Sequence, residues 1–296
     1  MIRVNEIVLE RIEIATGDVE IDNRGVLSDK ALETTGFIRR FVVKKGVSLF
    51  DLAFAAASKI PKDELAEIGG VIAATFSNEK RFPQLSVAIA SALGLSANIP
   101  ALDIQMACSA YPYALYLAGR MAADTGRKIL VVDGDIQSTL SDLSDMSTTP
   151  LFTDAMSATI VSANESNSSF VDFYSKSSDI LSCEASGPIK MDGFGVFSFV
   201  ACEVMPFLKR FLADANETNI DAFVPHQANM YMVRQLANSL GLNDKLCTSG
   251  EEFANPGSAS IPLTIAKRGV SGRVFIAGFG AGLSASAAMV TVQARE

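Results

Sequence analysis

The stretch Leu93-Gly94-Leu95 recurs as Leu240-Gly241-Leu242, 147 residues further along the chain. Two chemically interesting residues keep this spacing, because Cys108 lies 14 residues after Gly94 and Asn255 lies 14 residues after Gly241. The offset is close to half of the 296 residues, and a repeat of that length indicates an internal duplication. We therefore expect two similar halves, with Cys108 and Asn255 at equivalent positions.

Within each half, short apolar runs bounded by glycine, proline or asparagine alternate with longer helical patterns. The predicted strands are 68–75, 99–104, 128–133, 222–225 and 273–277, and the predicted helices are 83–93, 109–123, 229–240 and 257–267. This alternation predicts an α/β protein in which helices cover the faces of the sheets. The duplication divides the chain into an N-terminal unit, residues 1–164, and a C-terminal unit, residues 165–296.

The composition is that of a globular protein, with 49% hydrophobic and 20% charged residues and a formal net charge of −8. No run approaches the roughly 20 apolar residues of a membrane span, and residues 1–20 lack a signal-peptide core, so we expect a cytoplasmic protein. An acidic chain without a basic cluster argues against nucleic acid as a partner. The four cysteines form no CxxC pair and the chain has one histidine, so we expect no metal site.

Cys108 precedes a predicted helix rich in small residues, which begins at Ser109. A thiol at a helix N-terminus meets unpaired backbone N–H groups and the positive end of the helix dipole, and both favour the thiolate. The thiolate is the nucleophilic form, so a covalent catalyst would hold its sulfur at such a place. The structural alternative is a small buried apolar side chain that only fills space.

His226 follows the predicted strand 222–225, and Asn255 precedes Pro256-Gly257. Taken singly, His226 also fits a loop histidine that is only hydrogen-bonded, and Asn255 also fits an ordinary turn. Together with Cys108 they supply a nucleophile and two N–H donors. Such donors can hold a thioester carbonyl while negative charge develops on its oxygen.

A glycine-rich segment, Gly278-Phe279-Gly280-Ala281-Gly282, follows the last predicted strand. Only 14 residues come after it, too few for the helix, strand and acidic residue of a dinucleotide-binding unit. We expect instead a turn that brings backbone N–H groups close to a ligand.

Several motifs occur together in this chain. They are Thr35-Gly36, Arg81-Phe82-Pro83, the stretch from Asp103 to Tyr111, Leu151-Phe152-Thr153-Asp154, Met191-Asp192-Gly193, Pro225-His226-Gln227-Ala228-Asn229, the stretch from Asn255 to Pro262, and Gly278 to Gly282. With these motifs the chain resembles β-ketoacyl-acyl carrier protein synthase III, the initiating condensing enzyme of fatty-acid synthesis, in the thiolase superfamily. The resemblance implies the five-layered αβαβα thiolase fold, in agreement with the duplication.

The resemblance also implies catalytic roles. Cys108 would take an acyl group from a thioester, and His226 and Asn255 would hold a malonyl thioester while it loses CO2. The resulting enolate would attack the acyl group and release a 3-oxoacyl product. Backbone N–H groups of Cys108 and Ala281 would form the oxyanion hole, although the family usually has glycine at the position of Ala281. Phe82 resembles the residue that closes the partner's acyl pocket in a homodimer. No cofactor is implied, and the substrates would be acyl-CoA or acyl-carrier-protein thioesters.

Three further features depart from the family pattern. The Trp and Arg that usually precede the Thr-Gly element and hold the coenzyme A adenine are missing, and the chain has no Trp. The carrier-docking face, usually basic, has Ser198, Tyr231, Asn238 and Ser239 at the corresponding positions, which should weaken docking of an acidic carrier protein. The segment 165–190, which would cover the acyl pocket, is shorter than usual.

Three functions are therefore compatible with the residues. The first is a specialised condensing enzyme of fatty-acid or secondary metabolism, favoured by the intact Cys108, His226 and Asn255. The second is an acyltransferase of the same fold that acylates an oxygen, nitrogen or sulfur acceptor without decarboxylation. The third is a non-catalytic partner subunit of a ketosynthase, suggested by the altered recognition surfaces. We expect a homodimer, or a heterodimer with a related ketosynthase.

Overall fold

The structure, a computed structural model, describes residues 1–142, 144–185 and 187–294. Its strands are β1 (Ile2–Thr16), β2 (Val19–Asp22), β3 (Arg39–Val42), β4 (Ile68–Ala74), β5 (Ala101–Ile104), β6 (Lys128–Asp135), β7 (Ala155–Ser175), β8 (Leu181–Cys183), β9 (Ile189–Met191), β10 (Ala222–Pro225), β11 (Gly272–Gly280) and β12 (Ser284–Val292). Its α-helices are α1 (Asp29–Thr35), α2 (Leu49–Ala57), α3 (Lys62–Leu65), α4 (Leu85–Ala92), α5 (Ala110–Thr125), α6 (Gly193–Phe199), α7 (Met205–Ala215), α8 (Met230–Leu240), α9 (Gly250–Phe253) and α10 (Ser260–Arg268). Short helical turns are η1 (Asn23–Gly25), η2 (Ala107–Ser109), η3 (Gln137–Leu140), η4 (Thr149–Leu151), the π-helical η5 (Val200–Val204) and η6 (Gly257–Ala259).

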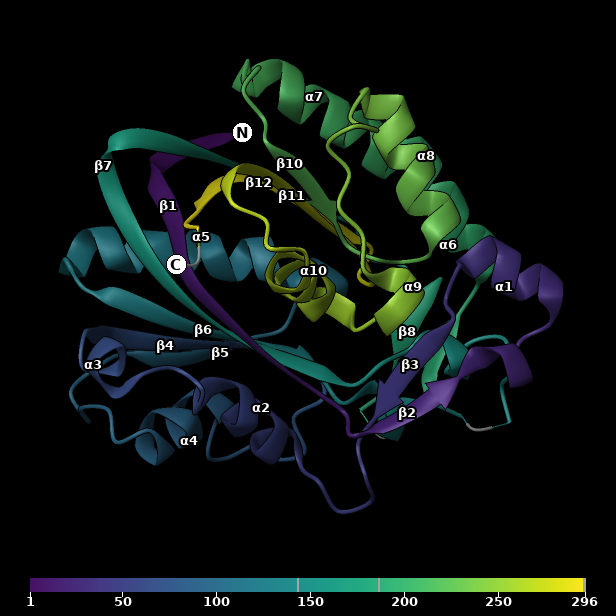
Figure 1. The fold of residues 1–296 in the computed structure, drawn as a ribbon, viewed down its shortest axis with the longest axis horizontal. Helices are drawn as coiled ribbons and strands as arrows, with labels where there is room; N and C mark the ends of the chain where they lie inside the picture. Colours follow the sequence, from purple (N-terminus) through teal and green to yellow (C-terminus); the bar gives the residue numbers. More distant parts are fainter. Residues whose placement is uncertain (143, 186, 295–296) are drawn as a thin grey trace.

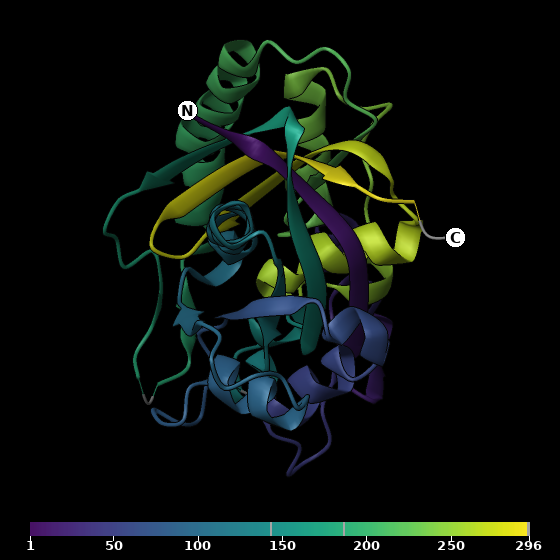
Figure 2. The same ribbon diagram turned by 90° about the vertical axis from the view of Figure 1, so that its left-hand side faces the viewer.

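The helices and strands are stacked in five layers (Figure 1). Helices α2 and α4 cover one face of the strands β4–β6, α5 and α10 lie in the middle, and α7 and α8 cover the outer face of β10–β12. The view from the side shows the same stacking, with α5 seen end-on at the centre (Figure 2). The predicted five-layered αβαβα fold is therefore confirmed.

Three apolar clusters hold these layers together. One lies between α2, α4 and the first set of strands, one surrounds α5 and α10, and one lies beneath α7 and α8. Strand β6 contributes to two of them, because Ile129 and Val131 face α5 whereas Leu130 and Val132 face α2 and α4. A strand that is buried on both faces reads as one continuous apolar run, as this one does.

The two halves repeat the same strand connectivity. In the first half, β4 pairs in parallel with β5 and β6, β6 pairs antiparallel with β7, and β7 pairs antiparallel with β1. In the second half, β10 pairs in parallel with β11 and with the segment at Leu246, β11 pairs antiparallel with β12, and β12 pairs antiparallel with β7. This repetition supports the duplication that the sequence indicates.

The repeated Leu-Gly-Leu stretches are helix stops. Gly94 follows α4 and Gly241 follows α8, and both glycines have φ of +70°. This left-handed conformation ends helices and favours glycine, which has no Cβ.

Strand β7 joins the two halves. Its residues 155–171 pair with β1, whereas 170–175 pair with β12, so the strands form one eight-stranded sheet. The predicted boundary between residues 164 and 165 falls inside this strand, and the two halves therefore share it. The division into two units stays a prediction. In the described ranges, no helix is both long and apolar enough to cross a membrane.

Candidate active site

Cys108, His226 and Asn255 line one cavity of about 210 Å³. Cys108 lies in η2 before α5, His226 follows β10, and Asn255 precedes η6 and α10. The chain therefore brings together three side chains that are far apart in the sequence, at the ends of two strands and two helices. We call this space the triad cavity.

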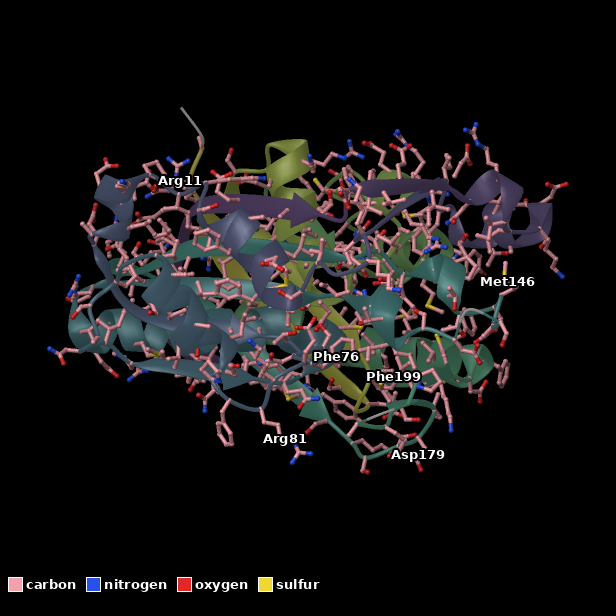
Figure 3. The ribbon with its side chains drawn as sticks, turned by 90° about the horizontal axis from the view of Figure 1, so that it is seen from below. Arg11, Phe76, Arg81, Met146, Asp179 and Phe199 are labelled. Carbon is pink, nitrogen blue, oxygen red and sulfur yellow. The ribbon has the colours of Figure 1, made fainter. Side chains whose placement is uncertain are left out.

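A second cavity of about 310 Å³ also reaches Cys108. We call it the hairpin cavity, because strands β8 and β9 form one of its walls. Apolar side chains such as Phe76 and Met106 line it, and Figure 3 labels Phe76. Leu181 and Phe152 line both cavities, so Cys108 lies where two chambers meet.

The residues before Cys108 and Asn255 share an unusual backbone conformation. Ala107 has φ of +42° and Ala254 has φ of +48°, and both belong to the few non-glycine residues with positive φ in the described chain. Such conformations cost about 1–3 kcal/mol and occur at sites where the surrounding structure enforces them. The equivalence of Cys108 and Asn255, inferred from their spacing, therefore extends to the positive φ of the residue before each.

The pKa of the Cys108 thiol is not lowered, contrary to what its place before a helix predicts. Burial raises its pKa to about 12, and the carboxylate of Asp135 adds to the rise. The backbone N–H groups of Ala281 and of Cys108 itself act in the opposite direction and lower the pKa of the thiol. Desolvation outweighs these donors, so the resting thiol is protonated at neutral pH.

Two buried carboxyl groups lie beneath the site at the end of β6. Asp133 accepts a hydrogen bond from Ser258 Oγ at 2.6 Å, and Asp135 Oδ1 accepts bonds from the hydroxyl groups of Thr75 and Ser77. Burial raises the pKa of Asp133 well above its ordinary value and that of Asp135 to about 6. Sequence reasoning missed both residues, although two aspartates at the end of a buried apolar strand were a usable signal.

The glycine-rich segment packs directly against the nucleophile. A Cβ on Gly280 would lie 2.9 Å from Cys108 Cβ and 3.2 Å from its sulfur, and one on Gly278 would lie 2.8 Å from Ser109 Cα. These glycines therefore allow β11 to approach Cys108 closely. Ala281, the expected oxyanion-hole residue, does not have a positive φ, so the side chain costs its backbone nothing.

His226 is buried, with its ring edge against Phe279 at 5.4 Å between centroids. Its Nδ1 lies 3.0 Å from the carbonyl oxygen of Gly257 and 2.9 Å from Ser260 Oγ, which leaves Nε2 for the triad cavity. Burial lowers the pKa of His226 to about 4, so the imidazole is neutral near pH 7. Ser260 falls inside the quoted motif but was not singled out from the sequence.

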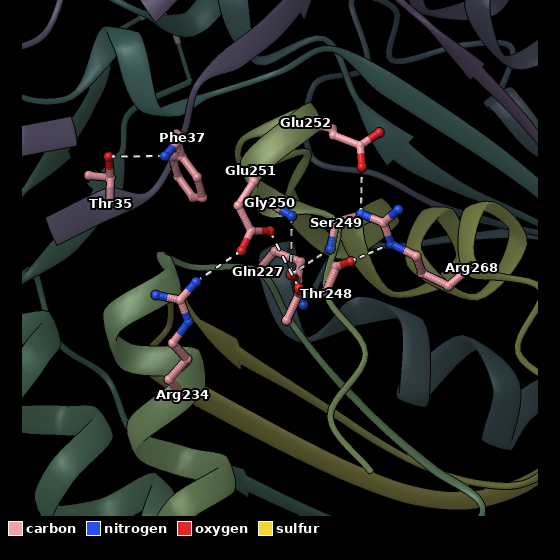
Figure 4. Close-up of polar contacts among 10 residues, drawn as sticks. All are labelled: Thr35, Phe37, Gln227, Arg234, Thr248, Ser249, Gly250, Glu251, Glu252 and Arg268. Carbon is pink, nitrogen blue, oxygen red and sulfur yellow. Dashed lines mark hydrogen bonds and ion pairs between the residues drawn. The ribbon is translucent and has the colours of Figure 1, made fainter. Parts of the chain in front are cut away.

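Gln227 anchors the loop that carries His226. Its Oε1 accepts hydrogen bonds from the backbone N–H groups of Ser249 and Gly250 at 3.1 and 3.3 Å (Figure 4). Its amide nitrogen donates to the carbonyl oxygen of Pro225 at 2.7 Å. A fully buried side-chain amide with these partners holds the imidazole in a fixed place.

Asn255 is oriented by its own turn. Its Oδ1 accepts a hydrogen bond from the N–H of Gly257 at 2.9 Å, so the NH2 group is the free end of the amide. Its backbone carbonyl accepts from Gln137 Nε2 at 3.1 Å and from the N–H of Thr153 at 3.0 Å. The side chain is thus a fixed N–H donor beside the cavity.

The surface residues singled out from the sequence lie away from these cavities. Phe82 is 80% exposed, and Figure 3 shows its neighbour Arg81 extending outwards at the edge of the molecule. Tyr231 is exposed on α8, where the cation Arg234 is paired with Glu251 at 3.1 Å (Figure 4). The described residues include no group of three His, Cys, Asp or Glu side chains placed to hold a metal ion.

Two family descriptions match the chain. The match to 3-oxoacyl-[acyl-carrier-protein] synthase III covers residues 102–178, and the match to its C-terminal region covers residues 212–292. The chain is also 30% identical over 280 residues to the β-ketoacyl-[acyl-carrier-protein] synthase III of Acholeplasma laidlawii, covering 90% of each protein. The enzyme of the same name from Staphylococcus haemolyticus is 30% identical over 276 residues, which cover 86% of this chain and 87% of that protein.

Solved structures share the fold. A 3-oxoacyl-(acyl-carrier protein) synthase from Burkholderia xenovorans superposes with a TM-score of 0.91 at 24% identity, covering 98% of this chain and 95% of that one. A β-ketoacyl-[acyl-carrier-protein] synthase III from Thermus thermophilus has a TM-score of 0.87 at 25% identity, covering 96% and 98%. The predicted thiolase-type architecture is thereby confirmed.

Proposed function

The chain belongs to the β-ketoacyl-[acyl-carrier-protein] synthase III family of condensing acyltransferases, and from this premise we propose how its residues perform the reaction. Cys108 is the nucleophile, and His226 and Asn255 hold the thioester that supplies the attacking carbon. The backbone N–H groups of Cys108 and Ala281 form the oxyanion hole. The observation that carries this proposal is the single cavity lined by all three side chains.

The first half of the reaction acylates the enzyme. Cys108 sulfur attacks the carbonyl of an acyl thioester, a new C–S bond forms, and the donor thiol leaves. The thiol proton of Cys108 is lost in this step and the departing thiolate takes one up, so the exchange is neutral overall. The backbone N–H groups of Cys108 and Ala281, which lower the pKa of the thiol, would stabilise the oxyanion that develops next to the sulfur.

The second half forms the carbon–carbon bond. A malonyl thioester in the triad cavity loses CO2, and the electron pair of the broken bond becomes an enolate. The N–H groups of Asn255 and His226 stabilise the enolate oxygen. The enolate carbon then attacks the acyl carbonyl, and the C–S bond to Cys108 breaks. The released thiolate takes up a proton, because its high pKa makes it a strong base.

The two cavities suggest where each substrate lies. We assign the acyl chain to the hairpin cavity, because its wall includes apolar side chains such as Phe76, Met106 and Ile189. We assign the malonyl thioester to the triad cavity, where the polar groups are. The thioester substrates are acyl and malonyl groups on coenzyme A or a carrier protein, and the reaction needs no further cofactor. Phe82 would contribute to the pocket of a second subunit.

One observation favours a second candidate function. The Gly257 carbonyl at 3.0 Å from Nδ1 of His226 can only accept a hydrogen bond, and a proton on Nδ1 leaves Nε2 as a base. A base at this place would activate an oxygen, nitrogen or sulfur acceptor for acyl transfer without decarboxylation. A purely structural subunit is disfavoured, because no structural requirement explains all three side chains.

Two measurements test the proposed function. Incubation with a panel of acyl-CoA and acyl-carrier donors should add one acyl mass to the protein, and Cys108→Ala should abolish the addition. Release of CO2 from malonyl-CoA should then fall in Asn255→Ala while acylation persists. Acyl transfer without any CO2 release would favour the second candidate, and no acylation with any donor would contradict both.

A further inference from the structure

Ser260 contacts the face of His226 that points away from the triad cavity. It is the first residue of α10 and is fully buried. Its Oγ lies 2.9 Å from Nδ1 of His226 and accepts a hydrogen bond from the backbone N–H of Gln227 at 3.2 Å. Within the described chain, Nδ1 of His226 is the one acceptor that the hydroxyl proton of Ser260 can reach. A buried hydroxyl proton without an acceptor costs about 1–3 kcal/mol.

The Gly257 carbonyl, the other neighbour of Nδ1, has a second donor. The backbone N–H of Ser260 also donates to this oxygen, across the turn that begins α10. The carbonyl therefore keeps a hydrogen bond whether or not Nδ1 carries a proton. The Gly257 carbonyl favours a proton on Nδ1, whereas the Ser260 hydroxyl favours a lone pair there. Only Ser260 loses its hydrogen-bond acceptor when the tautomer is the wrong one.

Counting the hydrogen bonds of each neutral tautomer separates them. With the proton on Nδ1, the imidazole donates to Gly257, and the hydroxyl proton of Ser260 has no acceptor. With the proton on Nε2, the Ser260 hydroxyl donates to Nδ1, and the Gly257 carbonyl still accepts from the N–H of Ser260. Only the second arrangement satisfies Nδ1 and both of its neighbours, and buried polar groups in proteins are nearly always satisfied.

We propose that Ser260 is a positioning residue that holds neutral His226 in the tautomer with its proton on Nε2. The imidazole then presents a donor, not a base, to the triad cavity, which Asn255 also lines. This inference rests on the proposed function for its catalytic meaning. Two N–H donors on one thioester carbonyl are what decarboxylation and condensation need, whereas activation of an acceptor needs a free lone pair on Nε2.

The tautomer can be measured without any substrate, because the chain contains a single histidine. In protein labelled with ¹⁵N-histidine, the two ring nitrogens give one pair of NMR signals, and the N–H nitrogen is distinguished from the lone-pair nitrogen by its shift. We expect the proton on Nε2 at pH 7 in the unmodified protein. In Ser260→Ala only the Gly257 carbonyl remains, so the proton should move to Nδ1. A proton on Nδ1 in the unmodified protein would overturn the proposal.

The two half-reactions supply a second readout. Ser260→Ala should lower CO2 release from malonyl-CoA about 100-fold, the typical loss for one donor to an oxyanion, and change acylation of Cys108 less than about threefold. Ser260→Thr, which keeps the hydroxyl, should restore both the tautomer and CO2 release. Thr264→Val is the matched control, because it removes another buried hydroxyl of α10 that does not touch His226. Equal losses in both half-reactions, or the same losses in Thr264→Val, would mean that Ser260 is only structural.

These outcomes separate the two proposals. A proton on Nε2 in a protein that decarboxylates no thioester would contradict the proposed function and leave the role of Ser260 towards His226 intact. Decarboxylation by a protein whose His226 proton is on Nδ1 would contradict the role of Ser260 and leave the proposed function intact.

Discussion

The raised pKa of Cys108 predicts how its thiol reacts with a small disulfide such as cystamine. At pH 8 a free thiol with a pKa near 8.5 is about one quarter ionised, whereas a thiol with a pKa of about 12 is ionised roughly once in 10⁴. The thiolate fraction is therefore roughly 2,000-fold smaller. A more basic thiolate is also more nucleophilic, which restores a factor of about 40 at a Brønsted slope of about 0.45. Cys108 should thus form the mixed disulfide some 50-fold more slowly than a free thiol at pH 8.

The pH dependence is the sharper part of this prediction. The rate at Cys108 should rise about tenfold per pH unit from pH 7 to 10 without reaching a plateau, because the thiol stays mostly protonated throughout. Peptide mass spectrometry after timed quenching gives the modified fraction of each cysteine separately. The exposed Cys202 monitors the reagent in the same samples. A plateau below pH 9, or a rate at pH 8 equal to that of Cys202, would refute the reasoning from burial and nearby carboxylates.

Three further predictions follow from the site and its surroundings. Gly280→Ala should slow acylation at least about tenfold, because its Cβ would lie 3.2 Å from the sulfur of Cys108 and overpacking of this kind costs about 1–3 kcal/mol. Intact-protein mass spectrometry measures the rate, and an unchanged rate would contradict the close packing. Burial raises the pKa of Asp133, so the stability that its protonated form contributes is fully present below pH ~4 and is lost as the pH rises. Asp133→Asn, which keeps an acceptor for Ser258, should raise Tm by several degrees at pH 8 and not at pH 4. A lower Tm at both pH values would argue against this linkage. Tyr231 and the other positions expected to face a carrier protein carry no charge, and Arg234 on the same helix is paired with Glu251. KM for a malonyl-carrier protein should therefore change less than about twofold between 50 and 300 mM NaCl, whereas a steep rise with salt would indicate charge steering.

The regular elements of the fold were predictable where a local pattern exists. Strands β4, β6 and β10 are short apolar runs, and their predicted ranges agree with the structure to within two residues. Strands β1, β7 and β12 were not predicted. Polar residues interrupt β7, whose stretch from Asn164 to Ser168 lies near the point where β7 reaches the strands of the second half, and no local period marks such a point.

The sequence by itself determined the family, and it predicted an internal duplication and three candidate reactive side chains. These follow from residue types at fixed spacings along the chain and from the helix and strand periods. Both can be read from the order of the residues alone. Only the tertiary structure decided that the three side chains share a cavity and that a second cavity meets it at Cys108. It also reversed the expected effect on the Cys108 thiol, because desolvation and the charge of Asp135 act through space and outweigh the local N–H donors. The contact between Ser260 and His226 is of the same kind, since the two residues are 34 positions apart in the chain.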